Sequence, residues 1–165
     1  MKTLVSLVPL GLGLAVFGAL VWYMVDRDMV VGIWLLAAFL VAHGLVHLMF
    51  VAPQPTAQAR ARAHTGTEYP FDLRQSWLVR AVHLDERMVR GIGVGLMAVV
   101  VLGFVAAGLS TIGLLVPVGW WPALVLGATV ASLALLAIEG APGLALGVAI
   151  DVALLWIVVV AAWAP

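Results

Sequence analysis

The sequence predicts an all-α, polytopic integral membrane protein: a helical bundle of five transmembrane helices plus one cytoplasmic amphipathic helix. Only 10% of the 165 residues are charged and 65% are hydrophobic, whereas soluble domains carry about 25% charged residues. No Asp, Glu, Lys or Arg occurs in residues 3–25, 29–59 or 91–138. A helix of about 20 apolar residues crosses a bilayer and satisfies its own backbone polar groups there.

The five spans follow from these uncharged runs. The first is expected at about 4–25, as a retained span, because its apolar run is longer than a signal-peptide core and no small-residue cleavage site precedes DRD. The second is expected at about 29–52, the third at about 91–109 and the fourth at about 122–138. The fifth follows the turn EGAPG and covers about 143–163.

Aromatic residues mark the connection between the third and fourth spans. This connection, STIGLLVPVGWWP, ends with Trp120 and Trp121. Tryptophan is enriched where a membrane meets water. Both side chains are therefore expected at headgroup level.

The sizeable polar region of the chain is the loop at 53–90, between the second and third spans. Its second half, FDLRQSWLVRAVHLDERMVR, repeats apolar residues at helical spacing. These residues are Leu73, Trp77, Ala81, Leu84 and Met88. We expect an amphipathic helix over about 72–88 that lies on the membrane surface, with Asp72 as its N-cap.

The distribution of cations predicts the orientation in the membrane. The loop contains six of the eight Lys and Arg residues: Arg60, Arg62, Arg74, Arg80, Arg87 and Arg90. Five spans place Lys2 on the same side, and the positive-inside rule assigns that side to the cytoplasm. We expect a bacterial-type cytoplasmic (inner) membrane protein with its N-terminus inside and its C-terminus outside. The net charge of zero indicates no nucleic-acid partner, and the absence of cysteine excludes thiolate chemistry.

Histidine and aspartate side chains occur inside two of the predicted spans. His43 and His47 lie in LVAHGLVHLMF, and Asp151 lies in the fifth span. At the helical rise, His43 lies roughly 13 Å and Asp151 roughly 12 Å from the cytoplasmic end of its span, whereas His47 lies roughly 7 Å from it. His43 and Asp151 are thus expected at similar depth. Polar side chains in a bilayer usually face the bundle interior and are candidates for function.

Several roles are compatible with this candidate intramembrane polar site. His43 and Asp151 would bond two helices together, or would hold a proton or bind a cation. Alternatively, Asp151 would bond Ser132 or Thr129 of the fourth span. His43 and His47 share a helix face and, with Asp151, would offer two imidazoles and a carboxylate to zinc, copper or iron. HGLVH lacks the glutamate of the H-E-x-x-H motif. A haem with two axial histidines is disfavoured because both lie on one helix, but a single axial His43 or His47 remains compatible.

The loop offers a second candidate site at the membrane interface, formed by Asp72, Ser76, Trp77 and His83. Ser76 and His83 share one face of the expected helix, but about 10 Å separates them, too far for a direct hydrogen bond. No G-x-S-x-G, Walker-type or dinucleotide-binding motif occurs. No catalytic residue is assigned, and the sequence favours a protein that is not an enzyme.

One stretch of the chain resembles other proteins. AHGLVHLMF, with YPFDLRQSW some twenty residues later, is similar to segments of small multi-spanning bacterial membrane proteins that are uncharacterised. The resemblance covers about a third of the chain, from His43 to Trp77. It implies no activity, and it draws attention to His47, Asp72 and Ser76 as well.

Small residues four apart suggest close helix packing within the bundle or between chains. The pairs are Gly91 with Gly95, Gly103 with Ala107, and Gly143 with Gly147. We therefore expect an accessory or interaction subunit that packs in the lipid bilayer against its own copy or a larger membrane complex. The alternatives are a small proton- or ion-coupled transporter using His43 and Asp151, and a metal- or haem-binding membrane protein using His43 and His47.

Overall fold

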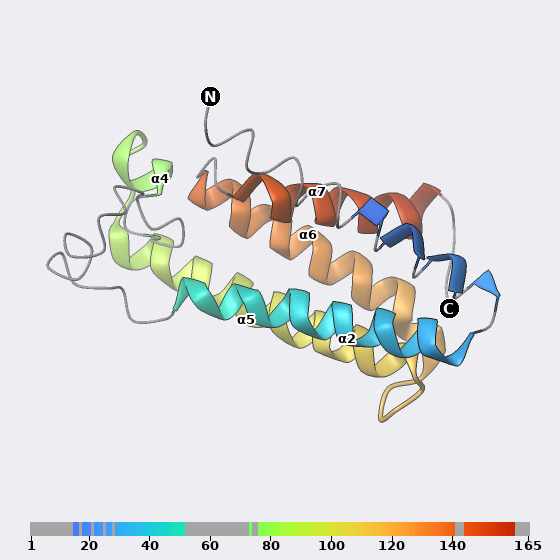
Figure 1. Ribbon diagram of the computed structural model, residues 1–165. Helices are drawn as coiled ribbons and strands as arrows, with labels where there is room; N and C mark the ends of the chain where they lie inside the picture. Colours follow the sequence, from blue (N-terminus) through green and yellow to red (C-terminus); the bar gives the residue numbers. More distant parts are fainter. Residues whose placement is uncertain are drawn as a thin grey trace, which may run out of the picture.

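A computed structural model describes residues 29–51, 73, 76–140 and 144–160, together with scattered residues between 15 and 27. These residues form helices and their connections, without a strand among them. The four longer helices are α2 (Val30–Val46), α5 (Glu86–Thr111), α6 (Trp121–Glu139) and α7 (Ala145–Leu155). Figure 1 shows α2 beside α5 and α6 beside α7, with α4 at the end of the bundle where α5 begins.

Three of the described helical stretches are long and apolar enough to cross a membrane: Val30–Phe50, Glu86–Thr111 and Val118–Glu139. The first combines α2 with the 3-10 turn η1 (His47–Phe50), and the third combines the 3-10 turn η3 (Val118–Trp120) with α6. The prediction of an all-helical protein with apolar helices of membrane length is confirmed. The number five is not, because the first predicted span lies mostly outside the described residues and the helix Ala145–Val160 is shorter than the others.

The amphipathic helix expected over about 72–88 is interrupted. The short helix α4 covers Trp77–Arg80, and the backbone is not helical again until α5 begins at Glu86. Two features explain the break: His83 has a positive φ of 58°, and the Asp85 side chain accepts a hydrogen bond from Met88 N at 2.9 Å. A left-handed residue ends a helix, and an aspartate N-cap starts one. The expected N-cap, Asp72, lies outside the described residues.

An apolar core lies between α2, α5, α6 and α7. Its fully buried members include Leu40, Val100, Phe104 and Val125. Trp121 belongs to this core with no exposed surface, whereas Trp120 is 64% exposed. The expectation of two headgroup anchors is therefore corrected for Trp121, because the first residue of α6 faces the bundle.

Glycines bring α2 and α5 close together. A Cβ atom on Gly44 would lie 2.8 Å from the Cβ of Phe104, and one on Gly108 would lie 2.8 Å from the carbonyl oxygen of Ala37. These distances are well below the 3.5–4.0 Å at which carbon atoms pack. Any larger residue at either position would push the two helices apart.

The predicted small-residue pairs differ in their surroundings. A Cβ atom on Gly103 of α5 would lie 2.8 Å from the Cβ of Ala128 on α6, so this glycine packs inside the bundle. Gly91 and Gly95 have no atom of the described chain within 4 Å of such a Cβ. Those two glycines therefore lie on an outer face of α5.

Candidate functional site

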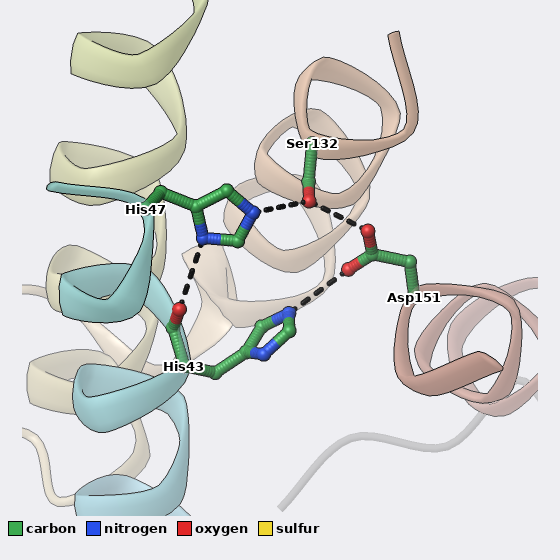
Figure 2. Close-up of polar contacts among 4 residues, drawn as sticks. All are labelled: His43, His47, Ser132 and Asp151. Carbon is green, nitrogen blue, oxygen red and sulfur yellow. Dashed lines mark hydrogen bonds and ion pairs between the residues drawn. The ribbon is translucent and has the colours of Figure 1, made fainter. Parts of the chain in front are cut away.

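Four polar side chains meet between the helices, in a group that we call the buried cluster: His43 of α2, His47 of η1, Ser132 of α6 and Asp151 of α7 (Figure 2). Ser132 and Asp151 have no exposed surface, and the two histidines are 8% and 4% exposed. The structure thus brings together the two histidines and the aspartate that the sequence places inside predicted spans.

The cluster is a continuous chain of hydrogen bonds. His43 Nε2 lies 3.0 Å from Asp151 Oδ1, and the other carboxylate oxygen, Oδ2, accepts from the Ser132 hydroxyl at 2.6 Å. Ser132 Oγ also lies 2.9 Å from His47 Nε2. His47 Nδ1 donates to the backbone carbonyl of His43 at 3.0 Å, because a carbonyl oxygen can only accept.

Aromatic rings hold the two imidazoles in place. The His43 ring stacks on Phe39 with centroids 5.9 Å apart and meets Phe104 of α5 edge-on at 4.8 Å. The His47 ring stacks on Phe50 at 6.2 Å. The close approach of α2 and α5 at Gly44 is what brings the Phe104 ring to His43. The imidazole orientations are therefore set by apolar packing as well as by hydrogen bonds.

The ligand set considered for a metal does not fit this arrangement. Both nitrogens of His47 are in hydrogen bonds, and His43 Nε2 faces Asp151. Among the described residues, no group of three or more His, Asp or Glu side chains is placed to hold a metal ion. An axial haem ligand also needs a ring nitrogen available, so the Nε2 atoms of these histidines do not fit a haem either.

The interfacial loop residues lie elsewhere. Ser76 donates from Oγ to the carbonyl oxygen of Ile138, and Trp77 donates from Nε1 to that of Ala137 at 2.7 Å. We call this pair of contacts the α6 cap, since it satisfies carbonyls in the last turn of α6. His83 is exposed and contributes nothing to the cap, and Asp72 lies outside the described residues. The structure therefore separates the two candidate sites.

Ser132 makes more contacts in the structure than the sequence predicts for it. Ser132 and Thr129 are the two hydroxyl residues of the predicted fourth span, and either would bond Asp151 across the helices. The structure selects Ser132 and also bonds it to His47, whereas the buried Thr129 hydroxyl has no hydrogen-bond partner among the described residues. A single hydroxyl that faces two titratable groups is not visible in a sequence, because it depends on the rotation of α6.

Comparison with protein-family models, with curated proteins and with solved structures finds no match to this chain. Its class therefore follows from fold and site alone. The part of the chain that the structure describes is all-helical, with helices of membrane length and a buried, hydrogen-bonded cluster of two histidines, a serine and an aspartate.

Proposed function

We propose that this chain is a small proton-coupled membrane transporter in which His43 and Asp151 bind the coupling proton. The supporting observation is the 3.0 Å contact between His43 Nε2 and Asp151 Oδ1, which joins α2 to α7 in the bundle interior. Ionisable side chains inside a membrane bundle are costly and mark ion and proton pathways. Imidazole is also the side chain whose protonation ordinarily changes near neutral pH, and a neighbouring carboxylate is one of the groups that alter it.

Proton binding at this contact would change the packing of α7. The attraction between His43 and Asp151 depends on their charges, so a change of protonation alters how strongly α7 is held against α2. Five residues after Asp151, α7 continues as a π-helical turn, η5 (Trp156–Val160). π-Helical turns are rare in proteins, and those that occur often lie at functional sites. The coupling would therefore act through the position of α7.

The test is proton flux in liposomes that contain the purified full-length chain and a trapped pH-sensitive dye. A potassium gradient with valinomycin supplies the driving potential. We expect flux above that of empty liposomes, reduced about tenfold (about 1.4 kcal/mol in the barrier) or more by Asp151→Asn and by His43→Gln. Ser110→Ala is the matched control. This buried serine donates to the Pro117 carbonyl and bonds no member of the cluster. Equal flux in the wild type and Asp151→Asn would refute the proposal.

We further infer five crossings of an inner membrane, with the N-terminus inside. Arg80, Arg87 and Arg90 are exposed at the end of the bundle where α4 lies and α5 begins (Figure 1). Trp120, exposed at the start of α6, marks the opposite end. This distribution agrees with the positive-inside rule. Fusions after Arg90 and after Pro165 test it: alkaline phosphatase is expected to be active only at Pro165, and activity at Arg90 would contradict the orientation.

A specific observation also favours the accessory-subunit hypothesis. Gly91 and Gly95 lie one turn apart on α5 with no atom of the described chain within 4 Å of a Cβ there. Small residues at this spacing let a second transmembrane helix approach closely. Native mass spectrometry in detergent tests this: we expect Gly95→Leu to shift an oligomer to monomer, while Gly127→Leu on α6, also open, does not. An unchanged mass for Gly95→Leu would exclude this face.

A further inference from the structure

The hydrogen bonds of the buried cluster determine how many protons it holds. Four bonds link its members: two from His47, one between Ser132 and Asp151, and one between Asp151 and His43. Each bond needs one proton between its two heavy atoms. The Ser132 hydroxyl lies between His47 Nε2 and Asp151 Oδ2, and its single proton serves only one of those two bonds.

Ordinary protonation states supply one proton too few. Two neutral imidazoles and a hydroxyl carry three protons between them, and an ionised carboxylate carries none. The four bonds therefore require one more proton. With that proton the cluster has a net charge of zero. Without it, the net charge is −1, and two acceptors face each other somewhere along the chain of bonds.

Burial favours the same state as the hydrogen-bond count. All four side chains are at most 8% exposed, and a net charge or an unpaired acceptor is costly in such surroundings. A fifth proton, on His43 Nδ1, would make the cluster cationic. The neutral, four-proton state is the one that satisfies every bond without a buried net charge.

We propose that His43, His47, Ser132 and Asp151 bind one exchangeable proton as a unit, and that Ser132 passes it between His47 and Asp151. The inference deepens the proposed transport function and rests on it for its biological use. The step is balanced. The Nε2 proton of the His47 imidazolium moves to Ser132 Oγ while the Ser132 hydroxyl proton moves to Asp151 Oδ2. An imidazolium and a carboxylate become a neutral imidazole and a carboxylic acid, and the net charge stays zero.

No other described titratable group faces the cluster closely. His43 and His47 are the titratable residues of α2 and η1, and Asp151 is that of α7. On α5, Phe104 contacts His43. The ionisable residues of α5 lie in the first two turns of that helix: Glu86, Arg87 and Arg90. On α6, Glu139 follows Ser132 by seven residues, about 10 Å along the helix. The exchangeable proton is therefore shared within the cluster.

Asp151→Asn separates proton binding from folding. An asparagine amide donates to Ser132, Ser132 then donates to a neutral His47, and the amide oxygen accepts from His43. All four bonds are kept without an exchangeable proton. This variant is therefore expected to fold while it loses the proton that the wild type binds.

The experiment measures protons and protonation states on full-length protein in lipid nanodiscs. An indicator dye measures the protons released when the pH is raised. Infrared difference spectra against Asp151→Asn report the carboxylic-acid band of Asp151, and ¹⁵N NMR reports the protonation of the two imidazoles. We expect the wild type to release one more proton per chain than Asp151→Asn does. Before release, either His47 is an imidazolium or Asp151 is a carboxylic acid. A neutral His47 beside an ionised Asp151 throughout would overturn the proposal.

Two hydroxyl deletions on α6 test the relay. Ser132→Ala disconnects His47 from Asp151, so the single shared transition should split into two independent ones. Thr129→Val is the matched control, because the Thr129 hydroxyl bonds none of the described residues, and it should keep the shared transition. A Ser132→Ala protein that titrates like the wild type would exclude the relay. If the protein releases the proton but shows no proton flux in liposomes, the transport proposal is refuted and the shared proton stands. If it shows flux but releases no extra proton, the shared proton is refuted and the transport proposal stands.

Discussion

The buried cluster and the α6 cap both place polar groups on the same helix, and they do so in opposite ways. In the cap, Ser76 and Trp77 donate to backbone carbonyls at the end of α6. In the cluster, Ser132 in the body of α6 is bonded on both sides by titratable side chains. Each cap bond has a donor that always carries its proton and an acceptor that never does, whereas the cluster bonds depend on one exchangeable proton.

This difference teaches which polar contacts in an apolar bundle respond to pH. A hydroxyl or an indole N–H on a carbonyl does not titrate near neutrality. A chain of imidazole, hydroxyl and carboxylate does. The cap therefore serves stability and the position of α4, and the cluster joins stability to proton binding.

The largest expected effect is that of Asp151→Ala. This change leaves His43 and Ser132 without their shared partner in the bundle interior, and each buried group without a partner costs about 1–3 kcal/mol. We expect a loss of about 2–4 kcal/mol in the free energy of unfolding, measured in mixed detergent micelles. Asp151→Asn is the control and should lose less than about 1 kcal/mol; an equal loss would show that the carboxylate charge itself holds the helices.

The next effect tests the packing that positions the histidines. Gly44→Ala places a methyl group 2.8 Å from the Phe104 Cβ, and overpacking of this kind costs about 1–3 kcal/mol. Gly91→Ala, in open space on α5, should be neutral or slightly stabilising because alanine favours helix. The same unfolding measurement separates the two. A neutral Gly44→Ala would mean that α2 and α5 adjust without strain.

A dependence of stability on pH should distinguish the two regions directly. The folded cluster binds one proton more than the unfolded chain, whose histidines are neutral and whose Asp151 is ionised above neutrality. The unfolding free energy should therefore fall as the pH rises, by up to about 1.4 kcal/mol per pH unit. Asp151→Asn should lack this component, while Ser76→Ala should keep it. Unfolding titrations between neutral pH and about pH 9 measure it, and identical slopes in all three proteins would contradict it.

A smaller effect is expected at the α6 cap. Trp77→Phe keeps the ring but removes the N–H that donates to Ala137 at 2.7 Å, and Trp77 is 48% exposed. Water can replace that donor, so we expect a loss of about 0.5–1.5 kcal/mol that does not change with pH. Hydrogen exchange at the end of α6 should increase in this variant, and an unchanged exchange rate would exclude a capping role.

The smallest effect is predicted for Thr129→Val. The two side chains have nearly the same shape, and the Thr129 hydroxyl is buried without a hydrogen-bond partner among the described residues. Removing it should leave the unfolding free energy unchanged or slightly raised, within about 0.5 kcal/mol. A loss above that range would show that this hydroxyl has a partner, and that Ser132 is not the one serine or threonine of α6 that matters.

The helices were predictable because their signals are local. Uncharged runs located α2 with η1, α5 and α6 to within about five residues at each end, and a depth count along two helices put His43 and Asp151 at similar depth. The break between α4 and α5 was harder to see. The apolar spacing continues through it, and the capping by Asp85 competes with that pattern.

The sequence by itself determined that the chain forms apolar helices long enough to cross a membrane and that two of its apolar runs carry His43, His47 and Asp151. Both follow from local composition, because the length and hydropathy of a run decide whether its helix is apolar enough to cross a bilayer. Only the tertiary structure decided which polar groups meet. Each residue turns the helix by about 100° and advances it by about 1.5 Å, so small differences in rotation or register select among possible partners. The rotation and register of α6 bury Trp121 and Glu139. They place the Ser132 hydroxyl, and not that of Thr129, between His47 and Asp151.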